Sequence, residues 1–132
     1  MIVKSLVCSA VLTAALGLAD SAVAQDGVTL FTENCAACHQ PTGKGVPGFF
    51  PALDGNKVVQ GDPKAPAYVL LHGRGGMPNF SEELTDEKMA SVLSYVRSAW
   101  GNKAPAVDTA TIAAARGDPG PPQQDASVLP FH

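Results

Sequence analysis

The residues with the clearest chemical potential form one pentapeptide, Cys35-Ala36-Ala37-Cys38-His39. Two thiols separated by two residues can form a redox disulfide, supply half of a zinc site, or bind the two vinyl groups of a haem. A zinc site needs a second Cys/His pair at ligand spacing, and the sequence offers none. A thioredoxin-like motif needs a βαβ context, which is also missing.

The histidine directly after the second cysteine favours haem. Cys35 and Cys38 would bind the vinyl groups and His39 would ligate the iron, because Cys-x-x-Cys-His is the signature of c-type haem attachment. The motif occurs once, so the sequence predicts one covalently bound haem c.

A second axial ligand must come from the few remaining methionines and histidines. Met89 lies on the apolar stripe of a predicted helix, where core packing accounts for it, and His132 is the last residue. Met77 lies in Gly75-Gly76-Met77-Pro78, where glycines permit close backbone approach and proline stiffens the loop. We therefore predict Met77 as the sixth ligand, with His72 as the alternative. Methionine ligation favours ferrous iron and leaves no open position for a substrate, which indicates an electron carrier rather than an enzyme.

Several helices must position these residues. In the last helix of the core, Thr85 is a suitable N-cap, acidic residues follow it, and Gly101 is placed to end it. Its apolar residues recur at helical spacing: Met89, Val92, Leu93, Val96 and Trp100.

Two further helices are predicted at about 66–72 and 27–34, the latter leading directly into the cysteines. An alanine-rich segment at 102–117 has room for one short helix. The glycine- and proline-rich stretch 40–62 is predicted to be a long loop that wraps a cofactor. No segment alternates as a strand should, so the expected fold is all-α.

The ends of the chain differ from this core. A basic start, an uncharged apolar run and Ala22-Val23-Ala24 have the layout of a secretory signal peptide at 1–24. The run is short against the roughly 20 residues of a membrane span, which disfavours the alternative of an uncleaved anchor. Cys8 would be removed with the peptide. We expect a haem-binding domain at 25–117 and a proline-rich, disordered tail at 118–132.

Charge excludes one class of function. Without Lys4 and Asp20 the expected mature chain keeps eight of the nine basic and eleven of the twelve acidic residues, a net charge of −3. No basic block suggests nucleic acid as a partner. No other stretch is apolar enough to span a membrane after signal cleavage.

On these residues the chain resembles class I cytochrome c. It is most similar to the small cytochrome subunits and partners of bacterial periplasmic dehydrogenases, such as quinoprotein alcohol dehydrogenases. Four segments carry the resemblance: the attachment site and glycine loop at 35–45, Phe50-Pro51-Ala52-Leu53-Asp54-Gly55, the methionine loop at 72–80, and the last helix and its exit at 84–102.

The resemblance implies roles for individual residues. The carbonyl of Pro51 would accept the Nδ1–H of His39 and fix the orientation of the ring. Leu53 would pack on the haem face, and Met77 would be the sixth ligand. Arg74 could pair with a haem propionate, as could Lys57, although each is also explained as a solvated charge.

The resemblance further implies that the first and last helices cross near a glycine. Gly27 and Phe31 would lie on one face of the first helix and meet Leu93, Tyr95 or Val96 of the last.

The implied function is a periplasmic, exported, monohaem carrier of single electrons. A periplasmic dehydrogenase would be the donor, and an oxidase or another cytochrome the acceptor. The alternatives are a fixed cytochrome subunit of a dehydrogenase or oxidase complex, and a five-coordinate haem enzyme or gas-binding protein.

Overall fold

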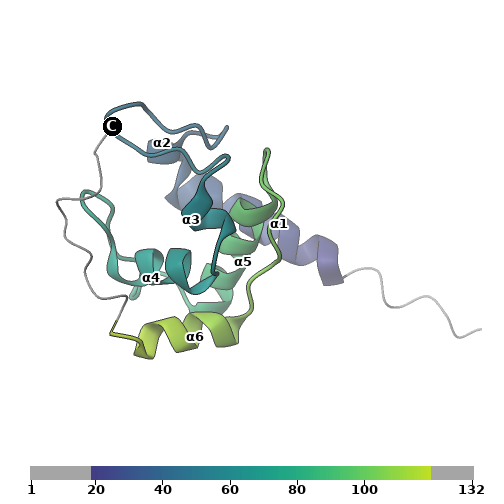
Figure 1. Ribbon diagram of the computed structural model, residues 1–132. Coiled ribbons are helices and arrows are strands. Elements are labelled where there is room, and N and C mark those ends of the chain that lie inside the picture. Colours follow the sequence, from purple (N-terminus) through teal and green to yellow (C-terminus); the bar gives the residue numbers. More distant parts are fainter. Residues whose placement is uncertain (1–18, 120–132) are drawn as a thin grey trace, which may run out of the picture.

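A computed structural model describes residues 19–119 of the chain, with side chains from residue 26 onward, and Figure 1 shows its arrangement. Its helices are α1 (Ala19–Asn34), α2 (Ala36–His39), α3 (Lys57–Gln60), α4 (Lys64–His72), α5 (Asp86–Ser98) and α6 (Thr109–Gly117). Between residues 19 and 119 the chain forms no strand, and only the isolated bridges Val46–Phe50 and Arg74–Met77 pair extended backbone. The predicted all-α class is confirmed.

Helix α5 begins as its sequence predicts. The Oγ1 of Thr85 accepts a hydrogen bond from the backbone N–H of Lys88 at 3.4 Å, and Asp86 and Glu87 occupy the first turn. Four residues of the predicted apolar stripe are buried, Met89 (fully), Val92, Leu93 and Val96, while Trp100 is partly buried and lies beyond the helix. Sequence pattern and core position agree along this helix.

The predicted end of α5 is wrong. The helix ends at Ser98, because Ala99 is extended and Trp100 has a positive φ of 54°. A left-handed conformation is unusual for a bulky residue and requires compensating contacts. Here the indole packs edge-on against Phe31, with ring centroids 5.3 Å apart. The contacts of this ring therefore override the helical periodicity.

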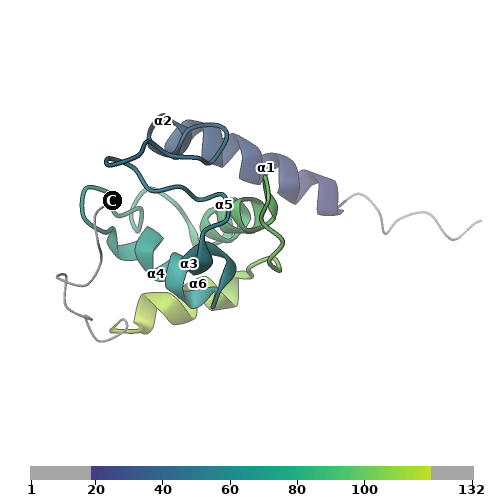
Figure 2. The same cartoon turned by 45° about the horizontal axis from the view of Figure 1, so that its top comes forward.

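Helices α1 and α5 cross at Gly27, as predicted, and Figure 2 shows α1 lying across α5. The glycine lies against the backbone of Ser91 and the Cβ of Tyr95. One turn later Phe31, only 2% exposed, packs against Tyr95 with ring centroids 5.5 Å apart. The crossing holds the helix that precedes the cysteines against the last helix of the core.

Two helix starts and one predicted loop also differ from expectation. Helix α1 already includes Ala19, the first described residue, although the sequence predicted a start near residue 27, because residues 19–26 include alanines and neither glycine nor proline. Helix α4 begins at Lys64, two residues before Pro66, since a proline is tolerated in the first turn where its missing N–H would be unpaired. The predicted loop 40–62 contains the short helix α3, which Asn56 caps by accepting hydrogen bonds from the N–H groups of Val58 and Val59.

The short helix predicted within 102–117 is present as α6, drawn below α4 in Figure 1. Ile112 and Ala115 bury its inner face against the core. The predicted signal peptide reaches into the start of α1, while residues 1–18 and most of the predicted tail, residues 120–132, lie outside the described part of the chain. None of the helices between residues 19 and 119 combines the length and apolarity needed to cross a bilayer.

Candidate functional site

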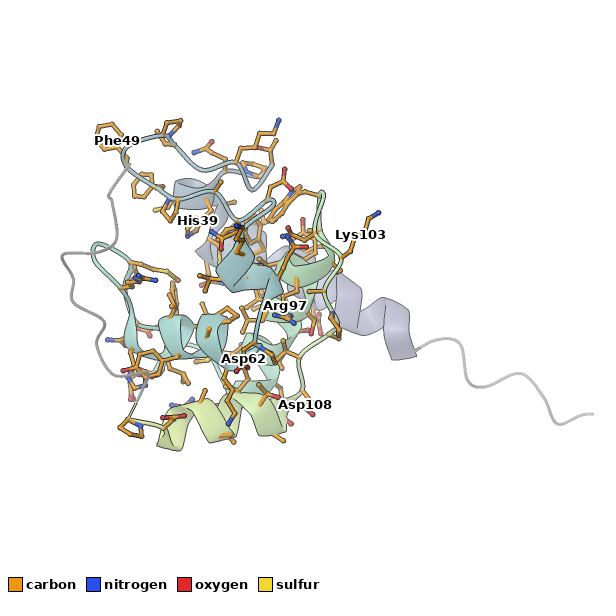
Figure 3. All side chains as sticks on the ribbon, in the orientation of Figure 1. His39, Phe49, Asp62, Arg97, Lys103 and Asp108 are labelled. Carbon is orange, nitrogen blue, oxygen red and sulfur yellow. The ribbon has the colours of Figure 1, made fainter. Side chains whose placement is uncertain are left out.

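Helix α2 consists of the last four of the five residues of the attachment motif. The N–H groups of Cys38 and His39 both donate to the carbonyl of Cys35, at 3.2 and 2.9 Å. This turn buries His39, which is 8% exposed, beneath the loop that follows it (Figure 3). The local helix thus places both cysteines beside the histidine.

The orientation of His39 is set by the carbonyl of Pro51, whose oxygen lies 2.9 Å from Nδ1. A carbonyl only accepts hydrogen bonds, so Nδ1 carries the proton and Nε2 keeps its lone pair. The contact that the resemblance implied is therefore present, and it leaves the imidazole ready to bind a metal through Nε2.

The two cysteines differ in environment. Neither forms a disulfide; Cys35 is half-buried and Cys38 is exposed. Burial, with a smaller contribution from Cys38, raises the pKa of the Cys35 thiol to about 11. At neutral pH this thiol is protonated and is a poor nucleophile or metal ligand. Burial of Cys35 therefore disfavours the thiolate that a metal ion would need.

The loop after α2 is closed onto the motif by backbone hydrogen bonds. The N–H of Gly45 donates to the carbonyl of His39 at 2.9 Å, and the carbonyl of Gly43 accepts from Leu53 and Asp54 at 2.7 and 3.0 Å. Gly43 and Gly45 have positive φ values of 67° and 61°, which permit these tight turns. The segment that contains Pro51 is thereby held beside His39.

The loop between α4 and α5 presents Met77. Arg74 and Met77 exchange two backbone hydrogen bonds, and Phe80 anchors the loop by donating its N–H to the carbonyl of Leu70 at 2.8 Å. Gly73 has a φ of 72°, and a Cβ there would lie 2.6 Å from the carbonyl oxygen of Met77. Gly75, one of the glycines predicted to shape this loop, also has a positive φ, of 56°, but the close backbone approach is made at Gly73, which the sequence placed only at the end of a helix. Figures 1 and 2 both place this loop on the same side of the molecule as α2.

The other residues predicted for the site have distinct environments. Leu53 and Met77 are partly buried and pack against the hydrophobic core. Arg74 is exposed, as is Lys57, and neither side chain has a polar partner among the described residues. His72, the alternative ligand, is exposed, and its ring lies tilted by 36° against Tyr68 at a centroid distance of 4.2 Å.

Three residues brace this site although the sequence analysis gave none of them a role in it and placed Trp100 only on the apolar stripe of the last helix. Asn102 is 2% exposed and hydrogen-bonds to the 53–55 segment. Trp100 donates from Nε1 to the carbonyl of Pro41 at 3.0 Å. Arg97, also 2% exposed, donates to the carbonyls of Val59, Gly61 and Pro105. The only signal in the sequence was two polar residues and a tryptophan around the end of an apolar helix.

The residues present fit a covalently bound haem. Of two unpaired cysteines, Cys35 precedes α2 and Cys38 lies within it, and a buried histidine has its Nδ1 satisfied and its Nε2 available. Partly buried apolar side chains from separate segments, Leu53, Met77 and Phe80, lie at the edge of the core. The described residues contain no cluster of three or more His, Cys, Asp or Glu side chains of the kind that holds a metal ion alone.

Comparison with known proteins also supports a bound haem. Residues 22–96 match the family described as cytochrome c oxidase, cbb3-type, subunit III. Cytochrome c-552 of Thermus thermophilus is 36% identical over 108 residues, which cover 69% of this chain and 72% of that protein.

Larger proteins are similar in part. The cytochrome c subunit of alcohol dehydrogenase (quinone) from Gluconacetobacter polyoxogenes is 34% identical over 108 residues, 73% of this chain but 23% of the subunit. Subunit CcoP of a cbb3-type oxidase from Azospirillum brasilense is 35% identical over 91 residues, 64% of this chain and 31% of the subunit. The chain therefore spans about a quarter of the length of the dehydrogenase subunits that it matches.

Since the family match covers more than half of the chain and the helices, thiols and oriented histidine suit the cofactor, this protein belongs to the cytochrome c family, has the class I fold, and carries haem c.

Proposed function

We propose that this protein is an exported, monohaem carrier of single electrons in the periplasm, which accepts electrons from a dehydrogenase. The observation that carries the proposal is the single Cys-x-x-Cys-His motif whose histidine is already oriented by Pro51. When bound, haem supplies an iron that alternates between the ferric and ferrous states.

Each site residue has a proposed task. Cys35 and Cys38 form the thioether bonds, and His39 ligates the iron through Nε2 while Pro51 holds Nδ1. Met77 is the sixth ligand, and its position in a loop braced by backbone hydrogen bonds supports little rearrangement between the two oxidation states. Leu53 covers the haem face.

A propionate partner is proposed for Arg74. Its side chain is exposed and lacks a polar partner among the described residues, so it is available for a carboxylate. Lys57 has the same property and is the alternative.

The proposed donor is a periplasmic dehydrogenase of the quinoprotein alcohol type, and the acceptor is an oxidase or another cytochrome. The names of the relatives support this pairing, since they include cytochrome subunits of alcohol, gluconate and fructose dehydrogenases and of a cbb3-type oxidase. A permanently attached subunit of such a complex is the second candidate, favoured by the larger size of those relatives.

Export is proposed from the sequence of residues 1–24. Cleavage after Ala24 gives a mature chain that begins at Gln25, inside the helix that the full chain forms as α1. The N-terminal sequence of protein purified from a bacterial periplasm tests this directly, and retention of residues 1–24 would refute it.

Haem stoichiometry tests the central proposal. Protein produced in a periplasm with haem-attachment machinery should give one haem per chain in a pyridine haemochrome assay, with a mass increase that survives denaturation. Cys35→Ala and Cys38→Ala should each leave little folded protein, because a core of this size gains stability from packing on the haem. A well-folded variant without haem would contradict the assignment.

Electron transfer to a named partner is a separate test. The ferric protein, mixed with a purified quinoprotein alcohol dehydrogenase and its alcohol, should be reduced in a stopped-flow experiment. Co-purification of a dehydrogenase in fixed stoichiometry would instead establish that the protein is a permanently attached subunit. A ferric protein that binds cyanide rapidly, and that binds carbon monoxide readily once reduced to the ferrous state, would favour the five-coordinate alternative.

A further inference from the structure

Trp100-Gly101-Asn102 follows Ala99 at the end of α5, and we call it the exit segment. It contacts two loops beside His39, at residues 41–43 and 53–55. Asn102 lies at its centre and is 2% exposed. Its Oδ1 accepts the N–H of Gly55 at 2.8 Å, and its Nδ2 donates to the carbonyl of Leu53 at 3.0 Å and of Val96 at 2.8 Å. One side chain therefore ties the end of α5 to the 53–55 segment.

Two further hydrogen bonds strengthen this tie. The N–H of Gly101 donates to Oδ1 of Asp54 at 3.0 Å. The indole of Trp100 donates to the carbonyl of Pro41 at 3.0 Å and lies over Gly43, where a Cβ would come within 2.6 Å of the ring. The exit segment thus holds both loops by side chains.

The two loops meet beside His39. Gly43, under the indole, accepts hydrogen bonds from the N–H groups of Leu53 and Asp54. Leu53 is held by Asn102 and lies two residues after Pro51, whose carbonyl accepts the Nδ1–H of His39. Asn102 is thus connected to the imidazole by its hydrogen bond to Leu53, the chain from Leu53 back to Pro51, and the hydrogen bond from His39 to Pro51.

A metal-bound histidine donates a hydrogen bond from its other ring nitrogen, and the acceptor of that bond fixes the orientation of the ring and makes it a stronger donor to the metal. The partner here is a backbone carbonyl, and a carbonyl can only be held in place through the chain around it. Asn102 satisfies three backbone groups at once in a buried position, so its loss releases the segment that carries Pro51.

We propose that Asn102 is a positioning residue for His39, acting through the 51–55 segment, with Trp100 bracing the other loop. This inference rests on the proposed role of His39 as an iron ligand. It assigns to the exit segment an influence on the reduction potential, although the segment contacts the imidazole only through Leu53 and Pro51.

The test uses the holoprotein and three variants. Asn102→Ala removes all three hydrogen bonds, and Asn102→Ser keeps a small polar group so that a folded protein is available if the alanine variant is not. Ser94→Ala is the matched control, because Ser94 also joins α5 to a later segment by two hydrogen bonds, to Val107, but makes none with residues 41–55.

The decisive readout is hydrogen exchange of the His39 Nδ1–H in the ferrous protein by NMR. Exchange should become several-fold faster in both Asn102 variants, since a lost hydrogen bond is worth about 1 kcal/mol. The reduction potential should rise, because a weaker Nδ1–H bond makes the imidazole a poorer donor to ferric iron. Ser94→Ala should lose similar stability and leave both quantities unchanged.

Two outcomes are contrary. If the Asn102 variants lose stability but keep the wild-type exchange rate and potential, Asn102 is structural only and the inference is wrong. If Ser94→Ala changes both readouts equally, the effect comes from general destabilisation and the inference is again wrong. A wild-type spectrum without a haem-bound histidine would instead refute the proposed ligation itself.

Discussion

Gly27 in α1 lies so close to Tyr95 in α5 that a Cβ added to the glycine would be 2.8 Å from the Cβ of Tyr95, too close for any side chain at residue 27. The same position is 2.7 Å from the carbonyl oxygen of Ser91. Small residues let two helix backbones approach in this way, and Phe31 and Tyr95 then pack beside the contact. The packing of α1, the helix that leads into the cysteines, therefore requires glycine at residue 27.

Gly27→Ala should lower the free energy of unfolding of the holoprotein by about 1–3 kcal/mol, the usual cost of overpacking. Gly117→Ala is the control, because a Cβ there meets no atom within 4 Å and its φ is not positive. Guanidinium denaturation followed by circular dichroism measures both. A Gly27→Ala protein as stable as the Gly117→Ala protein would show that α1 and α5 do not cross as described.

Met77→Ala should abolish the weak ferric absorption band near the red edge of the visible spectrum that is diagnostic of methionine ligation. It should also let ferrous iron bind carbon monoxide, since the sixth position is then open. Met89→Leu is the control, because Met89 is fully buried in the core and the exchange conserves volume. A band that survives in Met77→Ala and disappears in Met89→Leu would reverse the assignment.

Arg97→Met should destabilise the protein by about 3 kcal/mol, because it leaves buried carbonyls without a charged donor. The guanidinium donates to the carbonyls of Val59 at 2.6 Å, Gly61 at 3.0 Å and Pro105 at 2.9 Å, so α3 and the segment before α6 should loosen together.

Arg116→Met is the matched control for Arg97. Its ion pair with Asp86, 2.7 Å long, is partly exposed and should be worth no more than about 1 kcal/mol. Thermal unfolding at one pH compares the two. Equal losses would mean that the buried hydrogen bonds of Arg97 contribute no more than a surface pair.

Asp108 should make part of the stability depend on acid pH. Its carboxylate accepts hydrogen bonds from the hydroxyl and the N–H of Thr111, at 2.6 and 2.8 Å, and these lower its pKa below the ordinary value. The contribution is present above the ordinary pKa of about 4 and is lost as the pH falls through the lower pKa of the folded state.

Asp108→Asn keeps a cap acceptor but cannot titrate, so its Tm should fall less than that of the wild type between about pH 6 and pH 2. Glu82→Gln removes an exposed charge away from this cap and serves as the control. Identical acid profiles for the wild type and Asp108→Asn would show that the cap does not titrate with folding.

Local patterns in the sequence were sufficient for the attachment motif, the all-α class, the Thr85 cap and the buried stripe of α5. Each depends on residues within one or two helical turns, where spacing alone sets which side chains share a face. The same reasoning failed at the end of α5 and at α3. There, the contacts of Trp100 with residues far away, and a cap by Asn56 inside a glycine-rich stretch, outweighed the pattern.

The chemistry of this protein was readable in five consecutive residues, because two thiols and an imidazole at that spacing define both the cofactor and its attachment. What surrounds the imidazole was decided by tertiary structure. Pro51 reaches His39 across twelve positions, and Asn102 reaches Leu53 across forty-nine. Hydrogen bonds of this kind join backbone groups and side chains that no local spacing relates, so they exist only once the helices have packed and brought both loops to the end of α5.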